Sequence, residues 1–308
     1  MRRINKTFSS SFIQPWFMEN WDYNRWAEEF AMLKVIGIDE IIIQNTVDTY
    51  NKYAIYPTQI EGYSCSVTDV ICTALRAAEC TATKVRIGLG VNSGWWTGNT
   101  FIKSWLEAEA SINKTIAGEI NQLYGSHPLF GGWYIPYEFS QTTAVTKKQK
   151  ANLNNFYRNI ALYIRFISKD DIMVAPFYNV KYSFLCSISR WEEMLTEVLH
   201  ETGIDILALQ DSIGAGFNTM DELDKIFLYT KKAADCLKIK LYADTETFTA
   251  AKSGFIPAEQ SRIEQQISVE SKYVDKFTAF SIDHYQNRNT SSQIDNYYRY
   301  YNYYKNNK

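Results

Sequence analysis

Two glutamates, Glu138 and Glu246, end stretches of sequence that are typical of buried strands. The first stretch, residues 130–140 (FGGWYIPYEFS), is opened by two glycines and carries Glu138 near its end. The second, residues 240–248 (KLYADTETF), has the same design and ends in Asp244 and Glu246. Hydrolysis of a glycosidic bond needs a carboxylic acid that protonates the leaving oxygen and a carboxylate that attacks or stabilises the anomeric carbon. The two glutamates therefore predict a glycosidase.

We assign Glu138 as the acid/base and Glu246 as the nucleophile. Ionised Glu246 would raise the pKa of Glu138 by like-charge repulsion, which would keep the acid protonated near neutral pH. The alternative is that either glutamate pairs with a lysine or caps the helix that follows it, because glutamates are common at such positions.

Other polar and aromatic side chains fall near the ends of predicted strands. In a sugar site they would bond hydroxyl groups or orient the nucleophile; the alternative is a polar rim that water and loop amides satisfy. Trp95 and Trp96, flanked by glycines, can stack on the apolar face of a sugar ring, or one of them covers the edge of the fold. The predicted substrate-binding residues are Gln14, Trp16, Gln44, Asn92, Trp95, Trp96, Tyr134, Gln210, Asp211, Asp244, Asp283, His284 and Tyr285.

Motifs for cofactors and metals do not fit. Residues 88–90 (GLG), followed by Gly94, have the wrong spacing for a dinucleotide fingerprint and lie within a strand. The run IGAG at residues 213–216 leads into a helix whose acidic first turn would repel phosphate. The three histidines are scattered along the chain. We expect no cofactor and no metal.

Short β-type runs alternate with longer amphipathic segments along the whole chain, which is typical of a parallel sheet with helical crossovers. The length of 308 residues suits a (β/α)8 TIM barrel, so residues 1–308 are expected to form one such domain, of the α/β class. The expected strands are 11–16, 40–47, 84–92, 130–138, 171–179, 204–211, 240–248 and 276–285. The expected helices are 21–36, 67–80, 100–124, 147–168, 189–201, 220–237, 258–274 and one that starts at 292.

The turns that lead into the expected strands are short, whereas those that leave them are long and rich in aromatic, Gly and Asn residues. In such barrels the active site lies at the carboxyl ends of the strands, where both glutamates fall. If the glutamates point into the barrel, alternation puts Tyr137 on the helix side. It puts these residues in the lumen: Gly132, Tyr134, Pro136, Tyr242 and Asp244, then Arg86, Gly88, Gly90 and Asn92 in the third strand and Ala279, Ser281 and Asp283 in the eighth.

The charge balance disfavours nucleic acid as a partner, because 32 basic and 34 acidic residues give a net charge of -2 without a basic stripe. No apolar run reaches the length of a signal peptide or a membrane span, so no membrane partner and a cytoplasmic location are the default expectations, although a trimmed secreted protein would look the same. The five cysteines form no CxxC pair and are expected to be reduced. We expect a monomer or weak dimer that acts on an oligosaccharide or glycoconjugate.

Several segments resemble, in the same order, a bacterial family of unknown function that is classed with glycoside-hydrolase-like TIM barrels. They are FIQPW, GIDEIIIQNTVDTY with AIYPT, GGWYIPYEFS, VAPFYN, DILALQDSIGAG, LYADTETF and FSIDHYQNRN. The resemblance implies a (β/α)8 barrel related to clan A retaining glycosidases, whose acid/base and nucleophile are glutamates ending strands four and seven. These positions correspond to Glu138 and Glu246.

The chain departs from the clan A pattern at Tyr137, where those enzymes usually have an Asn that holds the sugar 2-hydroxyl. Either another residue does this or the substrate differs. The expected function is retaining hydrolysis through a covalent intermediate on Glu246. The alternatives are a non-catalytic carbohydrate-binding protein on the same scaffold and a barrel enzyme that acts on a non-sugar substrate.

Overall fold

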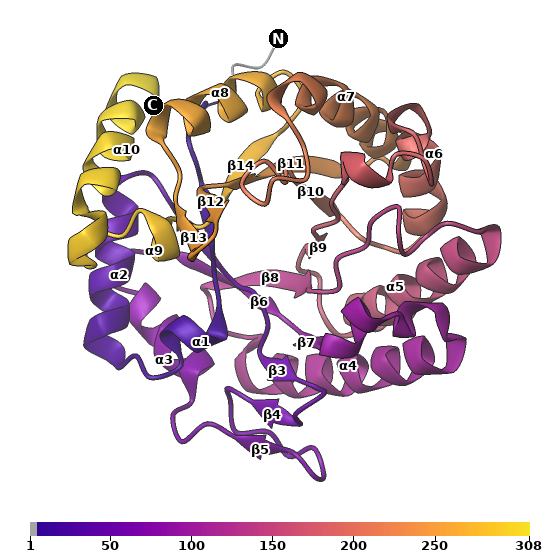
Figure 1. Ribbon diagram of the computed structural model, residues 1–308. Helices are drawn as coiled ribbons and strands as arrows, with labels where there is room; N and C mark the ends of the chain where they lie inside the picture. Colours follow the sequence, from indigo (N-terminus) through magenta and orange to yellow (C-terminus); the bar gives the residue numbers. More distant parts are fainter. Residues whose placement is uncertain (1–4) are drawn as a thin grey trace.

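Eight parallel strands close into a barrel in the computed structural model, which describes residues 5–308 (Figure 1). Around the barrel the order is β1, β14, β11, β10, β9, β8, β6 and β2. The closed order of parallel strands confirms the predicted (β/α)8 TIM barrel. The barrel strands are β1 (Ser10–Ile13), β2 (Glu40–Ile43), β6 (Lys84–Gly88), β8 (Phe130–Ile135), β9 (Ile172–Val174), β10 (Ile206–Gln210), β11 (Lys240–Glu246) and β14 (Lys276–Phe280).

Long helices surround the barrel, and helices that follow one another in the chain pack side by side (Figure 1). The last of them, rich in tyrosine, packs against the start of the chain, because the Tyr300 hydroxyl accepts the N–H of Phe8 at 2.8 Å. None of the helices described is long and apolar enough to cross a membrane. The long helices are α2 (Tyr23–Val35), α3 (Val70–Ala78), α4 (Lys103–Tyr124), α5 (Lys147–Ile167), α6 (Ile188–Leu199), α7 (Met220–Leu237), α8 (Gln260–Glu270) and α10 (Ile294–Asn307).

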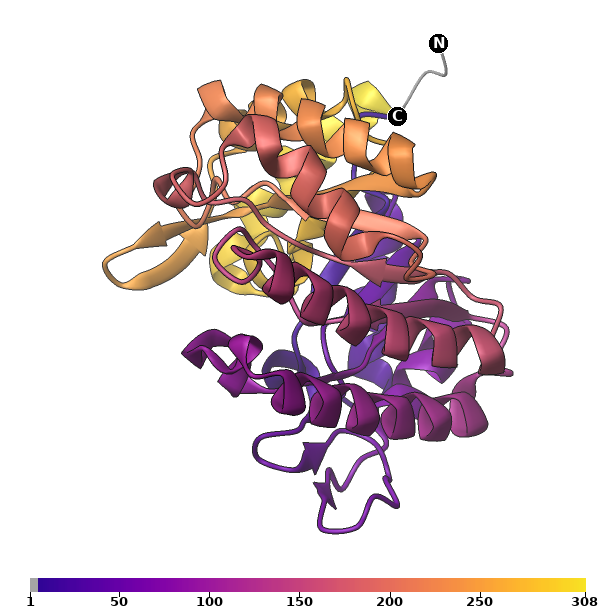
Figure 2. The ribbon, with the colours of Figure 1, turned by 90° about the vertical axis from the view of Figure 1, so that its right-hand side faces the viewer.

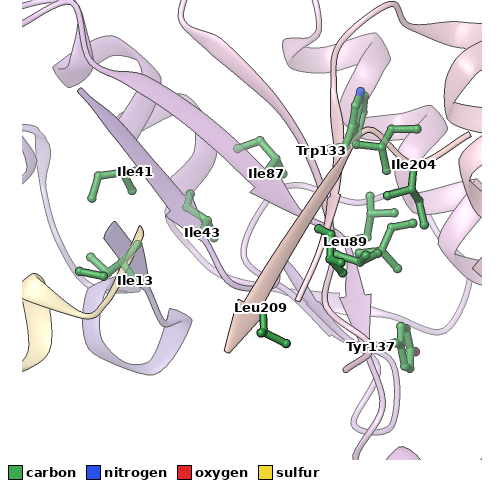
Figure 3. Packing of buried hydrophobic residues seen from close by; sticks show 14 of the residues in the cluster. Ile13, Ile41, Ile43, Ile87, Leu89, Trp133, Tyr137, Ile204 and Leu209 are labelled. Atoms are coloured by element: carbon green, nitrogen blue, oxygen red, sulfur yellow. The ribbon is translucent and has the colours of Figure 1, made fainter. Parts of the chain in front are cut away.

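Alternating residues of each strand pack into two separate cores. Ile41 and Ile43 join the large cluster between strands and helices, whereas Ile42 joins the small cluster inside the barrel. The same holds for Trp133 outside and Tyr134 inside, as the sequence predicts. Figure 3 shows part of the outer cluster. Each large side chain that is fully buried contributes about 1.5 to 3 kcal/mol, so both faces of the strands stabilise the barrel.

A buried ion pair closes the amino-terminal end of the lumen. The Arg86 guanidinium donates to Glu40 at 2.9 Å and to the carbonyl oxygen of Asp171 at 2.9 Å. Gly132 has a φ of +113°, and a Cβ there would lie 2.7 Å from Arg86 Nη1. The second glycine of the GGW run is therefore required by both its backbone conformation and the close approach of the arginine.

Three barrel strands end earlier than the sequence predicts because of prolines, which have no N–H for the strand ladder. β1 stops before Pro15, which opens the short helix α1 (Pro15–Met18) that carries Trp16. β8 and β9 stop before Pro136 and Pro176. Glu138 consequently lies beyond the end of its strand and not within it, which corrects the predicted boundary.

The predicted lumen positions in the third and eighth strands are partly wrong. After β6, the chain forms β7 (Gly90–Val91) outside the barrel, where a Cβ on Gly90 would lie 2.7 Å from Ile116 Cδ1 of α4. In β14 it is Phe280 that packs on the inner cluster, while Ala279 joins the outer one. Asn92 follows β7 and so lies outside the barrel, whereas Ser281 and Asp283 lie beyond the end of β14, at the start of the short helix α9 (Ile282–Tyr285) and within it.

Two excursions at the carboxyl ends of the strands were not predicted. A small sheet forms after β2, and a hairpin forms between β11 and α8. The helix expected at residues 258–274 is shorter than predicted at both ends, since α8 runs over Gln260–Glu270. Figure 2 shows the hairpin projecting from the barrel at the left. The remaining elements are β3 (Val47–Asp48), β4 (Tyr53–Ala54), β5 (Ser64–Cys65), β12 (Phe248–Ala251) and β13 (Gly254–Pro257), with short helices η1 (Ser93–Thr97), η2 (Asn99–Phe101), η3 (Val180–Tyr182), α9 (Ile282–Tyr285) and η4 (Ser291–Gln293).

Candidate active site

Glu138 and Glu246 line one cleft at the carboxyl ends of the strands, together with Gln210. The cleft has two lobes, and these three residues line both of them. The inner lobe, of about 390 Å³, lies over the strands at both ends of the chain. The outer lobe, of about 1000 Å³, lies over the loops after β7 to β10. Besides the shared residues, the inner lobe is lined by Gln14, Trp16, Gln44, Asp244, Phe248, Phe255, Phe280 and Tyr285.

Glu138 is positioned through its backbone. The indole N–H of Trp95 donates to the Glu138 carbonyl oxygen at 2.7 Å, and Trp95 itself is buried against Tyr137 at a ring separation of 4.9 Å. Tyr137 faces the helices and donates its hydroxyl to Glu109 of α4 at 2.6 Å. Tyr137, which precedes Glu138, and Trp95, which bonds its carbonyl oxygen, both pack on the helix side of the barrel. The side chain of Glu138 lines the cleft.

Glu246 ends β11, and its carboxylate accepts the backbone N–H of Ala215 at 2.6 Å. A Cβ on the neighbouring Gly214 would lie 2.9 Å from Glu246 Oε2 and 2.2 Å from the carbonyl oxygen of Phe248. The glycine at position 214 therefore allows the loop that contains the run IGAG to approach Glu246 closely. Arg262 of α8 donates to the carbonyl oxygen of Glu246 at 3.1 Å and holds the strand end from behind.

Both glutamates have raised pKa values, chiefly because they are buried. Burial raises the pKa of Glu138 to about 7, against a hydrogen bond from Gln210 that lowers it. Burial raises the pKa of Glu246 to about 8, and the negative charge of Asp211 adds to the rise. The expectation that Glu246 raises the pKa of Glu138 by repulsion is thus corrected: desolvation is the cause. The pair can share one proton near neutral pH.

Two aspartates lie near this pair, one in the inner lobe and one outside both lobes. Asp244 lines the inner lobe, is 2% exposed, and its Oδ1 has no hydrogen-bond partner among the described residues. Its pKa is raised well above the ordinary range by burial and by the charges of Glu138 and Glu246. Asp211 is fully buried outside the lobes and accepts the N–H groups of Ile213 at 3.0 Å and of Glu246 at 3.3 Å. Asp244 can meet a substrate, whereas Asp211 orients Glu246.

A chain of polar side chains forms one wall of the inner lobe. The indole N–H of Trp16 donates to Gln14 at 3.1 Å, and Gln14 donates to Gln44 at 2.7 Å. His284 lies behind this wall, where burial lowers its pKa to about 4 and the neutral ring accepts the N–H of Gln14 at 3.2 Å. Tyr285, which lies on α9 together with His284, lines the inner lobe directly.

Several predicted substrate-binding residues do not line the cleft. Asn92 bonds Glu109 at 2.7 Å on the α4 side, and Tyr134 belongs to the inner core. Asp283 is fully buried and accepts the Ser11 hydroxyl at 2.5 Å, because β14 ends at Phe280. The structure brings these predicted residues to the cleft: Gln14, Trp16, Gln44, Trp95, Trp96, Gln210, Asp244 and Tyr285. It leaves outside the cleft Asn92, Tyr134, Asp211, Asp283 and His284.

The sequence analysis missed six phenylalanines that line the cleft. Phe101, Phe177 and Phe217 line the outer lobe, and Phe248, Phe255 and Phe280 line the inner lobe. Phe177 follows Pro176 at the end of β9 and Phe217 follows the IGAG run, so their positions after strand ends could have identified them. Phe255 lies on a hairpin for which the sequence offers only Gly254 as a turn signal.

Metal-ligating groups are not gathered anywhere in residues 5–308, where no three His, Cys, Asp or Glu side chains are arranged to hold an ion. The residues that line the cleft therefore bring acid, amide and aromatic groups to a ligand.

Solved structures with the same architecture are glycosidases by name. A Bacteroides thetaiotaomicron protein proposed to be an alpha-L-fucosidase aligns with a TM-score of 0.82 and 24% identity over 99% of this chain and 98% of its own. An endo-1,4-beta-D-mannanase from Thermotoga petrophila aligns at 0.61 and 11% identity, over 89% and 87% of the chains. A family 1 β-glucosidase from Thermotoga maritima aligns at 0.56 and 11% identity, over 99% of each chain. At these identities the likeness shows the barrel fold alone.

A family model described as a domain of unknown function (DUF4434) matches residues 8–293. A search of curated proteins gives no match. The family match and the barrel neighbours confirm the resemblance expected from the sequence.

Proposed function

Because the chain belongs to the DUF4434 family and two glutamates of its barrel line one cleft, we propose that it hydrolyses a glycosidic bond with retention of configuration. The observation that carries the proposal is the pair Glu138 and Glu246, which come from strands on different sides of the barrel and have pKa values raised to about 7 and about 8. Groups whose pKa values lie near neutral pH are suited to acid and base chemistry.

In the proposed reaction, the reacting form of the pair has Glu138 protonated and Glu246 ionised, which is the less populated of the two singly protonated forms because the pKa of Glu138 (about 7) lies below that of Glu246 (about 8). Glu138 donates its proton to the glycosidic oxygen while the bond between that oxygen and the anomeric carbon breaks. Glu246 Oε2 accepts the N–H of Ala215, so we assign the attack on the anomeric carbon to Oε1. The leaving saccharide departs with the proton. Glu138, now a carboxylate, takes a proton from water as the water oxygen attacks the anomeric carbon and releases Glu246.

Tyr137 takes no part in this reaction, since its side chain lies in the outer cluster. The contact with the sugar 2-hydroxyl that an Asn makes in clan A enzymes must come from another residue. The amides of Gln44 and Gln210 are candidates, because both line the inner lobe next to Glu138.

The proposal is tested by incubating the protein with a panel of 4-nitrophenyl glycosides and recording nitrophenol release. For any glycoside that is cleaved, the 2-deoxy-2-fluoro analogue should label Glu246, which peptide mass spectrometry detects. Proton NMR of the first product should show the anomer with the substrate's configuration. If the opposite anomer is formed first, the enzyme inverts the configuration and the proposed retaining mechanism is wrong.

The aromatic side chains of the outer lobe also suit a second function, a carbohydrate-binding protein without activity. Binding of a glycan that is never cleaved, and that persists unchanged in Glu138→Gln and Glu246→Gln, would favour this function over hydrolysis.

A further inference from the structure

The two lobes of the cleft differ in chemistry, and the candidate catalytic pair lies where they meet. Glu138, Gln210 and Glu246 line both lobes, so a bond that is cleaved between the glutamates has one sugar in each lobe. The inner lobe, at about 390 Å³, is at the small end of ligand pockets, which run from roughly 300 to 1000 Å³. The outer lobe, at about 1000 Å³, is at the large end.

The inner lobe has the polar groups that a sugar with several hydroxyls requires. The amides of Gln14 and Gln44 and the carboxyl group of Asp244, whose Oδ1 has no partner among the described residues, line the lobe. Phe280, which packs on the inner core of the barrel, lines it as well. A buried carboxyl oxygen without a partner costs free energy, which a hydroxyl of the substrate would offset.

Two aromatic side chains bound the inner lobe toward solvent. Trp16 comes from α1 and is 69% exposed, and Phe255 comes from the β12–β13 hairpin and is 61% exposed. The base of the hairpin is fixed, because the N–H of Ala250 donates to Gly214 at 2.8 Å and the N–H of Ala258 donates to Thr247 at 2.9 Å. A saccharide chain that entered the inner lobe would meet this wall.

The outer lobe offers a row of aromatic rings. Trp96, which is 55% exposed, lies with its ring centroid 6.3 Å from that of Phe177, and Phe177 lies 6.0 Å from Phe217. Neighbouring rings are tilted by 39° and 36°, so they form one curved surface. Aromatic surfaces of this kind bind rings by stacking and do not demand one pattern of hydroxyls.

The charged side chains that line the cleft indicate whether the bound sugar is charged or neutral. Among the described residues that line the inner lobe, three are acidic and none is basic, and Lys181 is the one basic residue among those that line the outer lobe. An anionic sugar in the inner lobe would find no basic side chain to pair with, and the ionised carboxylate of the Glu138 and Glu246 pair would repel it.

On the basis of the proposed function, we infer that the protein removes single uncharged sugars from the non-reducing end of a saccharide chain. The terminal sugar occupies the inner lobe, and the rest of the chain, which is the leaving group, lies on the row of Trp96, Phe177 and Phe217. This is exo-type cleavage.

The test begins with the neutral glycone found in the 4-nitrophenyl panel, built into an oligosaccharide with a fluorescent label at the reducing end. Chromatography at early times should show the free monosaccharide and a labelled product one sugar shorter. Blocking the terminal sugar with a 4,6-O-ethylidene group should abolish cleavage. Internal fragments, or cleavage of the blocked chain, would overturn the inference while leaving the proposed function intact.

A pair of variants tests the aromatic row. Phe217→Ala should lower kcat/KM for the oligosaccharide about tenfold, as expected for one large apolar contact. The loss should be smaller for the glycosyl fluoride of the same sugar, whose leaving group does not reach the outer lobe. Phe184→Ala is the matched control, since Phe184 is 78% exposed and does not line either lobe. Equal losses on both substrates would contradict the role of the row.

The two proposals fail in different ways. If neither glycosides nor glycosyl fluorides of any neutral sugar are turned over, the proposed function fails and the inference fails with it. If the fluoride is turned over and the labelled chain is cut internally, only the inference fails.

Discussion

The backbone N–H of Glu246 donates to the carboxylate of Asp211 at 3.3 Å, and Asp211 also accepts the N–H of Ile213 at 3.0 Å. One buried carboxylate just after β10 thus holds the end of β11 and the start of the loop whose Ala215 N–H bonds Glu246. Burial is the main cause of the raised pKa of Glu246, and the charge of Asp211 adds to it, so Asp211 contributes to both the position and the proton affinity of the candidate nucleophile.

Replacing Asp211 with Asn should shift the pH profile. Removal of the negative charge lowers the pKa of Glu246 from about 8, so the alkaline limb of kcat/KM should move to lower pH. The two oxygens of Asp211 accept different donors, Oδ1 from Ile213 and Oδ2 from Glu246 and Gln266, and the amide oxygen of Asn keeps only one of these positions. A general loss of activity from altered geometry is therefore expected beside the shift of the limb. The measurement is kcat/KM against pH for Asp211→Asn and the unaltered protein; an unmoved limb with lower activity throughout would mean that Asp211 has only a structural role.

The unaltered protein should give a bell-shaped profile of kcat/KM with limbs at about 7 and about 8. Activity requires one proton on the pair: below about pH 7 both Glu138 and Glu246 are protonated, and above about pH 8 both are ionised. A profile that is flat from pH 6 to pH 9 would contradict this assignment.

Glu138→Gln and Glu246→Gln should each lower kcat about a thousandfold, as is typical for loss of an acid or base in the reaction. The matched control is Tyr137→Phe, which alters the residue next to Glu138 but faces α4. It should leave kcat unchanged and cost about 1 to 3 kcal/mol of stability, because Glu109 loses a buried hydrogen bond. Stopped assays with purified, folded variants measure the first effect, and denaturant unfolding the second.

The contribution of Glu138 to the stability of the protein should fall as pH rises from 4.5 to about 7. Glu138 binds its proton more tightly in the folded state, so its contribution is present below its ordinary pKa of 4.5 and is lost as pH rises through about 7. This rise in pKa corresponds to about 3 kcal/mol. Glu138→Gln should therefore have a higher Tm than the unaltered protein at pH 9 and a similar Tm at pH 4, as measured by thermal unfolding. A higher Tm at pH 4 alone would have the wrong sign.

Asp244→Asn should raise Tm near pH 8 and lower kcat/KM at least tenfold, about the value of one lost hydrogen bond to a charged or buried group. The reason is that Asp244 carries a buried, unpartnered oxygen next to two other carboxyl groups. A gain in stability together with a loss in activity distinguishes a residue kept for substrate binding from one that supports the fold. Thermal unfolding and kinetics on the same preparation give both values.

Local sequence patterns predicted the barrel and the place of the two glutamates at one end of it, because both depend on alternation and on strand ends. The catalytic roles of the glutamates stay a prediction. Ile41 to Ile43 and Trp133 with Tyr134 sort to the outer and inner cores as the period of two requires. Glu246 is the last residue of β11, a strand that no proline interrupts. The predicted strand positions were wrong where the chain leaves the ladder, as at Pro15 and Pro136, although both prolines are visible in the sequence.

The positions of Asn92 and Asp283 depend on contacts between distant segments, and no local pattern reports these. Asn92 is drawn to Glu109 of α4, and Asp283 to Ser11 of β1. The raised pKa of Glu138 likewise follows from burial by surrounding elements and not from the residues beside it in the chain. Strand and helix types could be read from the chain, whereas the side chains that meet at the cleft required the assembled barrel.

The β12–β13 hairpin begins at Phe248, directly after the strand that carries Glu246. Its two strands pair from Phe248 with Pro257 to Ala251 with Gly254, and its tip projects away from the barrel (Figure 2). Paired residues can be added or removed at that tip without changing the register at its base. If the inner lobe holds the terminal sugar, as we infer, a longer or shorter hairpin would change the size of the sugar that fits, without altering Glu138 or Glu246.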